Sequence, residues 1–107
     1  MNVSNFYTYR VTWSEEDGEH VALCAEFPSL SYLDESASVA LQGIIDLVAD
    51  IIEDMKAQNE PIPEPIAKKN YSGKFQVRIT PEKHRILAIK AAEQGVSMNR
   101  YVSSLLS

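Results

Sequence analysis

The sequence predicts an α+β protein with an acidic front domain and a small basic tail. Three observations predict this class. Residues 6–26 alternate in the manner of a β-hairpin, residues 36–56 repeat apolar side chains at helical spacing, and residues 74–107 contain one short strand followed by two helices. The apolar runs are too short to span a membrane and the first ten residues lack a secretory pattern, so we expect a cytoplasmic protein.

The front domain begins with a predicted antiparallel hairpin. Its first strand, Phe6–Trp13, alternates polar residues with an apolar face that we assign to the sheet core, made of Tyr7, Tyr9, Val11 and Trp13. The pair Asp17-Gly18 marks the hairpin turn. The second strand, Glu19–Glu26, is expected to place Val21, Leu23 and Ala25 together on one side. Leu30–Leu33 is a candidate short third strand.

One long helix follows, and Asp34 or Ser36 caps it. Its apolar stripe suits one face of the hairpin sheet and runs through Leu41, Ile44, Ile45, Val48, Ile51, Ile52 and Met55. The segment Glu60–Pro65 contains three prolines in alternate positions, which favours a stiff, extended connector. Ile62 or Ile66 is a candidate edge strand. We therefore divide the chain into a front domain of residues 1–66, a linker of residues 67–73 and a tail domain of residues 74–107.

The tail has a compact series of start and stop signals. Thr80 is expected to cap a helix over about Pro81–Gln94, with proline at the first helical position, and Gly95 ends it. Ser97 then caps a second helix over about Met98–Leu106. Such a tail is too short to bury a core alone, because chains below ~40 residues need a disulfide, a metal or a partner. We expect a homodimer whose core contains Phe75, Val77, Ile79, Leu87, Val102 and Leu105.

The other face of the tail strand carries the polar residues Lys74, Gln76 and Arg78. A two-stranded antiparallel ribbon fits the major groove of DNA, where Lys and Arg can bind guanine and Gln can bind adenine. These three residues are therefore candidate base readers. The start of the second helix offers free N–H groups, so Ser97, Met98 and Asn99 are candidate phosphate ligands.

Charge is divided unevenly between the two parts. Residues 74–107 contain six Lys or Arg against two acids, a net charge of +4, whereas residues 1–73 contain four against thirteen, a net charge of −9. A basic tail suits a polyanion and an acidic front suits a cationic surface. Charge alone does not identify which front-domain residues contact a partner.

The front domain is not expected to be an enzyme. The first strand contains no acid that could join Asp46, Asp50, Glu53 and Asp54 of the helix in a two-metal nuclease site. His20 and His84 fall in different domains, and neither has metal-ligand spacing. Cys24 lies in an apolar strand and is expected to be a buried side chain rather than a nucleophile. The sequence therefore predicts no catalytic residue, no metal and no cofactor.

Both halves also resemble one known family. The tail, KFQVRITPEKHRILAIKAAEQGVSMNRYVSSLL, is similar to the ribbon-helix-helix pattern of bacterial repressors and antitoxins. The front stretch, EFPSLSYLDESASVALQGIIDLVADIIEDM, is similar to the HicB antitoxin domain, although Ser31–Glu35 lacks the glycine that the family often has before the helix.

The resemblance implies a degraded RNase H-like front domain that binds and blocks HicA, a small basic mRNA-cleaving toxin. It also implies repression of the chain's own operon by a dimer on double-stranded operator DNA, and by analogy a tetramer. Two alternatives stay open. One is a stand-alone ribbon-helix-helix repressor with an oligomerisation or ligand-sensing front domain, and the other, which the missing strand acid disfavours, is a metal-dependent RNase H-like nuclease.

Overall fold

The structure is a computed structural model that describes residues 3–106. The chain forms two compact units that divide between Tyr71 and Ser72, here named the front unit and the tail unit. Within residues 3–106, no helix combines the length and the apolar character that crossing a membrane requires.

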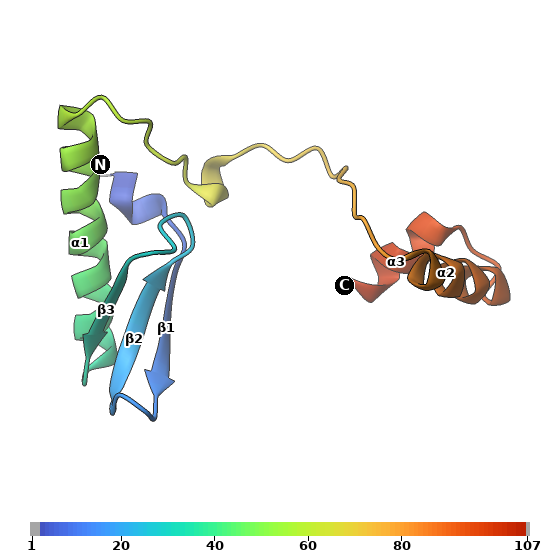
Figure 1. The fold of residues 1–107 in the computed structure, drawn as a ribbon, viewed down its shortest axis with the longest axis horizontal. Coiled ribbons are helices and arrows are strands. Elements are labelled where there is room, and N and C mark those ends of the chain that lie inside the picture. The colour runs from blue at the N-terminus through green and yellow to red at the C-terminus, as the bar shows by residue number, and fades with distance from the viewer. Residues whose placement is uncertain (1–2, 107) are drawn as a thin grey trace. The chain divides into compact units, whose positions relative to one another are not determined.

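The front unit is a three-stranded antiparallel sheet with one long helix across one face (Figure 1). Its elements are η1 (Val3–Phe6), β1 (Tyr9–Ser14), β2 (Glu19–Cys24), β3 (Ser31–Asp34) and α1 (Ala37–Ala57). The strand order is β1-β2-β3. The expected hairpin, third strand and helix are confirmed, as is the Ser36 cap, whose hydroxyl accepts a hydrogen bond from the Val39 N–H.

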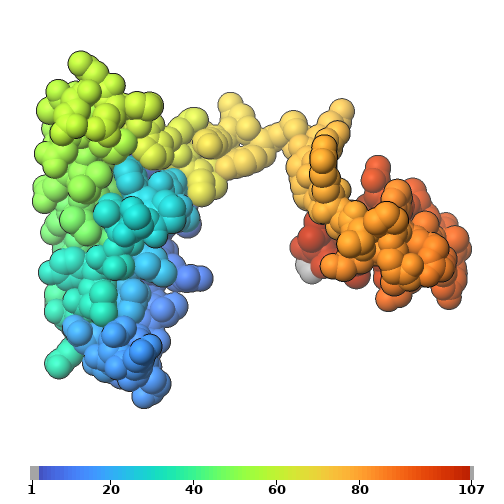
Figure 2. Space-filling view, viewed as in Figure 1, coloured from blue at the N-terminus to red at the C-terminus, as the bar shows by residue number. Residues whose placement is uncertain are grey.

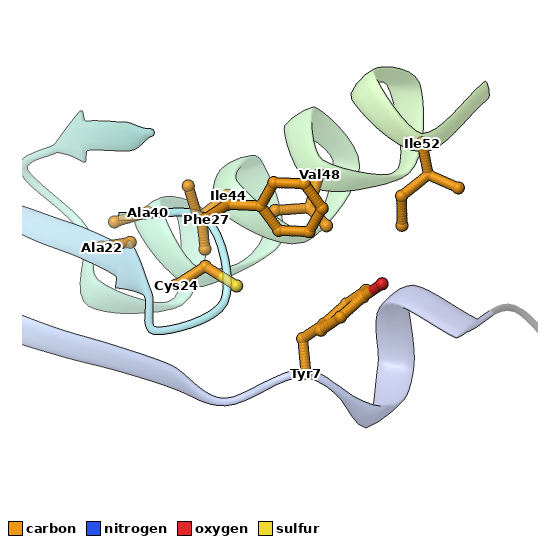
Figure 3. Close-up of a cluster of buried hydrophobic side chains, with 8 residues drawn as sticks. All are labelled: Tyr7, Ala22, Cys24, Phe27, Ala40, Ile44, Val48 and Ile52. Atoms are coloured by element: carbon orange, nitrogen blue, oxygen red, sulfur yellow. The ribbon is translucent and has the colours of Figure 1, made fainter. Parts of the chain in front are cut away.

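The core lies between the sheet and α1. Side chains from both layers, and from the loops that flank β1 and β2, point toward one another in Figure 3, namely Tyr7, Ala22, Cys24, Phe27, Ala40, Ile44, Val48 and Ile52. The stripe predicted for α1 supplies three of these, and Cys24 is buried as expected. The Tyr7 ring meets the Phe27 ring edge-on at 5.3 Å between centroids.

The structure shows which side of β2 faces the helix. Ala22 and Cys24 face α1 and are buried, whereas Val21 and Leu23 lie half-buried on the open face and Ala25 is exposed. Both alternating sets of this strand are apolar, so period two alone does not choose between them. The small residues are the inner set because they allow α1 to approach the sheet closely.

The first strand also differs from its prediction. It begins at Tyr9 rather than Phe6, because Val3–Phe6 forms a 3-10 turn. Tyr7 is buried, but Trp13 is half exposed and does not join the core. Its indole N–H donates to the Glu15 carboxylate at 2.9 Å, and its ring packs edge-on against His20.

The proline-rich segment after α1 is fastened to the front unit. We name residues 60–66 the strap. The Tyr7 hydroxyl donates to the Pro63 carbonyl at 2.6 Å, Pro65 is buried, and Ile62 packs against the core. No edge strand forms here, because Ile66 instead begins the 3-10 turn η2 (Ile66–Lys68). Residues 67–80, which connect the strap to the tail helices, are all exposed. Figure 2 shows this yellow segment as a thin run of atoms.

Candidate nucleic-acid interface

Two capped helices build the tail unit, α2 (Pro81–Glu93) and α3 (Met98–Leu105). The Thr80 hydroxyl accepts a hydrogen bond from the Lys83 N–H at 3.2 Å, and the Ser97 hydroxyl accepts one from the Arg100 N–H at 3.1 Å. Gly95 takes a φ of +67°, a left-handed conformation that glycine adopts without strain. The sequence therefore predicted both helices and both caps correctly.

The two helices pack against each other through a small apolar contact, and one of its buried residues was not predicted from the sequence. Ala91 of α2 and Tyr101 of α3 are the buried apolar residues of the described tail unit. Tyr101 was missed, although it lies three residues after Met98 and beside Val102, which is the spacing of an inner helix face. Of the predicted core residues on the helices, Leu87 and Val102 are half-buried, as is Val96 between the helices, whereas Leu105 is 60% exposed.

The predicted tail strand has no strand partner in the single chain. Residues 74–79 precede α2 without helix or strand hydrogen bonding, and all are exposed. The exposed fractions of the three apolar side chains are 74% for Phe75, 66% for Val77 and 42% for Ile79. A lone chain therefore leaves most of this apolar set in water, at a cost of about 25 cal/mol for each Å² that a partner would cover.

An open groove of about 640 Å³ lies between this segment and the two helices. Five of the six predicted dimer-core residues line this groove. The lining includes Phe75, Val77, Ile79, Leu87, Met98, Asn99, Val102 and Leu106. Leu105, the sixth, is absent from the lining and its neighbour Leu106 takes that place.

Two of the three candidate base readers lie outside the groove, as the alternation of the segment predicts. Gln76 and Arg78 are exposed and do not line it, whereas Lys74 is exposed and contributes to one end. The alternation expected from the sequence thus places apolar residues toward the helices and two polar residues away from them. DNA contact itself stays a prediction for all three.

The candidate phosphate ligands lie at the start of α3. The Ser97 side chain is engaged as the cap, so its hydroxyl already accepts the Arg100 N–H. The N–H groups of Met98 and Asn99 precede the first intrahelical hydrogen bond, which runs from the Tyr101 N–H to the Ser97 carbonyl. These two backbone N–H groups point out of the positive end of the helix dipole, where an anion is favoured.

The acids of the front unit are distributed rather than convergent. In the part of the chain that the structure describes, no three His, Cys, Asp or Glu side chains are grouped closely enough to hold a metal ion. Asp46 accepts a hydrogen bond from Gln42 at 2.9 Å, and Glu53 pairs with Lys56 at 3.6 Å. Burial raises the pKa of the Cys24 thiol, so this side chain is a poor nucleophile.

Residues 57–106 match the model of the HicB family. The matched range contains the strap, the connecting segment, the groove and both tail helices, and it is slightly less than half of the 107 residues. The match supports membership of the HicB family and is consistent with an antitoxin role. The front sheet and all of α1 except its last residue lie outside the match, so the resemblance noted there stays an expectation. No curated protein and no solved structure matches the chain.

Proposed function

We propose that the chain is a HicB-type antitoxin that also represses its own operon. In this proposal two tail units pair as a ribbon-helix-helix dimer on double-stranded operator DNA, and the front unit binds and blocks a HicA-like mRNA-cleaving toxin. The observation that carries the proposal is the uncovered apolar groove beside the unpaired segment 74–79. The family match over the same region supports it.

A second copy of the tail unit would cover this groove. The exposed set alternates along an extended segment, so two antiparallel copies would bury Phe75, Val77 and Ile79 together and satisfy each other's backbone groups. The same pairing would turn Gln76 and Arg78 of both copies to the opposite face of the ribbon. That face has the donors and acceptors that read base edges in the major groove.

Charge supports the division of tasks between the units. The net charge of +4 in residues 74–107 favours a nucleic acid, and the net charge of −9 in residues 1–73 favours a cationic partner such as a small basic toxin. Both interactions are expected to weaken as salt concentration rises.

Two variants of the full chain test the dimer and the base readers separately. Val77→Glu places a charge in the groove, so we expect a monomer by sedimentation and loss of binding to the DNA upstream of the gene. Gln76→Glu adds the same charge one residue earlier, on the other face, and we expect a dimer that binds this DNA weakly. A Val77→Glu chain that stays dimeric would exclude the groove as the pairing surface.

Binding of the toxin is tested by titrating the full chain with an inactivated form of the small basic protein encoded beside it. A stable complex is expected. Tight DNA binding by a chain that never binds this protein would instead favour the alternative of a stand-alone repressor whose front unit oligomerises or senses a ligand.

A further inference from the structure

Exposed apolar side chains of the front unit gather on β3 and the first turns of α1. The exposed fractions are 39% for Tyr32, 38% for Leu33 and 48% for Val39. A shallow groove of about 300 Å³ runs between the Tyr32 ring and the helix, lined also by Ser38, Gln42, Gly43 and Asp46. Leu33 follows Tyr32 in the strand and so directs its side chain to the opposite face of the sheet. We name the set Tyr32, Val39, Gln42 and Asp46, with the open backbone edge of β3, the edge surface.

The strand in this surface is open to pairing. Among the described residues β3 has one strand neighbour, β2, so its outer edge presents unpaired backbone groups. Proteins usually protect such an edge with lysine, proline or a covering segment. The β3 sequence Ser-Tyr-Leu-Asp contains neither residue, and its short length limits unspecific pairing while leaving room for a specific partner strand.

The surroundings of this edge are uniformly acidic. Between Arg10 and Lys56 the sequence contains no Lys or Arg but eleven Asp or Glu. Asp34 is the last residue of β3 and Glu35 follows it. Asp46 lines the groove and accepts a hydrogen bond from Gln42. A partner that lies on this surface must therefore supply positive charge.

The opposite edge of the sheet is less suitable. It is formed by β1, which includes Arg10, the only Lys or Arg within the three strands. A second copy of the front unit is also disfavoured on β3, because it would bring two sets of the same acids together.

We infer that the edge surface is where the cationic partner docks, by adding a β-strand alongside β3 and an apolar side chain over the Tyr32 groove. This inference rests on the proposed function and names its binding site. Strand addition supplies affinity through backbone hydrogen bonds, and the acidic rim supplies selectivity for a strand flanked by Lys or Arg. The open β3 edge thus gives the front unit a binding mode that needs no convergent active site.

The first test compares two charge reversals in the full chain against the inactivated small basic protein encoded beside it. Asp46→Lys is expected to raise Kd at least tenfold, and Glu64→Lys, an equal charge change on the exposed strap, less than threefold. Both variants are expected to keep the parent's circular dichroism spectrum and its unfolding midpoint in urea, which shows that the front unit folds. Equal effects of the two reversals would overturn the edge surface and leave only general charge attraction.

The second test locates the contact by hydrogen exchange of the same complex. Of the neighbouring backbone N–H groups of Tyr32 and Leu33, the one that points away from β2 is expected to exchange at least tenfold more slowly in the complex than in the free chain. Protection confined to the β1–β2 turn, or to the tail unit, would overturn the inference while the proposed function stands. Failure of the parent chain to bind at all would overturn both.

Discussion

The carboxylate of Glu26 accepts a hydrogen bond from the Ile66 backbone N–H at 2.9 Å, although 40 positions separate the two residues in the sequence. The same carboxylate accepts the Thr8 N–H at 2.9 Å and the Thr8 hydroxyl at 3.1 Å. One side chain therefore joins the start of β1, the end of β2 and the end of the strap. This contact sets where the front unit ends and where the exposed connecting segment begins.

Replacing Glu26 is expected to loosen the strap. Partial burial by itself raises the pKa of Glu26, but the hydrogen bonds from Ile66 and Thr8 outweigh it and hold the pKa below its usual 4.5. Glu26→Gln should reduce the free energy of unfolding by roughly 1 kcal/mol and Glu26→Ala by about 2 kcal/mol at pH 7, since bonds to charged groups are strong. Urea denaturation of the parent and of the two variants measures these changes in the free energy of unfolding.

The sign of the pH dependence provides the control. A carboxyl whose folded pKa is lowered stabilises the fold above pH 4.5 and loses that contribution as pH falls through the folded pKa. The stability gap between the parent and Glu26→Gln should therefore shrink in acid. The exposed strap residue Glu64 serves as comparison, and Glu64→Gln should change little at either pH. A gap that does not change with pH would show that the ionised carboxylate is not what holds the strap.

Gly43 of α1 allows the Tyr32 ring to lie directly on the helix, because a Cβ at this position would overlap the ring. Gly43→Ala should therefore destabilise the front unit by roughly 1–3 kcal/mol, as overpacking does. In a Tyr32→Ala background the same change should stabilise by about 1 kcal/mol, the ordinary advantage of alanine over glycine in a helix. A double-mutant cycle by thermal unfolding measures the reversal. The same sign in both backgrounds would exclude the ring as the cause.

Tyr9 is expected to limit stability in alkali. Burial raises the pKa of Tyr9 to about 12, and its hydroxyl donates to the Ser4 carbonyl at 2.6 Å. An unfolded tyrosine ionises near 10.0, so the contribution of Tyr9 is complete below that pH and is lost as pH rises toward 12. Unfolding of the parent and of Tyr9→Phe between pH 9 and pH 12 measures it. Parallel curves would contradict the assignment.

The parts that the sequence predicted are those that local chemistry determines. Thr80 and Ser97 cap their helices because a hydroxyl at that position satisfies an N–H two or three residues later, and Ser36 does the same for α1. These bonds need no information from distant residues. The expected alternation of Phe75, Val77 and Ile79 along the groove is local in the same sense.

The parts that the sequence did not predict depend on distant contacts. The sequence left the inner face of β2 open because Val21 and Leu23 are as apolar as Ala22 and Cys24, and only the approach of α1 selects the smaller pair. The strap was expected to be a stiff, extended connector, and the sequence did not predict that Tyr7 and Glu26 bind it from remote positions. The proposed pairing of segment 74–79 would depend on another copy, which no single chain contains.

The proposed base reader Arg78 provides the sharpest test of operator binding. Arg78→Ala should cost about 1–3 kcal/mol on the correct site and relax the base preference, because a bidentate contact to guanine would be lost. Lys83→Ala is the matched control on α2, since loss of a phosphate contact should weaken binding to all sequences alike and reduce the salt slope. Fluorescence anisotropy with operator and scrambled duplexes at several salt concentrations separates the two. An Arg78→Ala dimer as tight and as selective as the parent would mean that the outer face of segment 74–79 does not read the DNA.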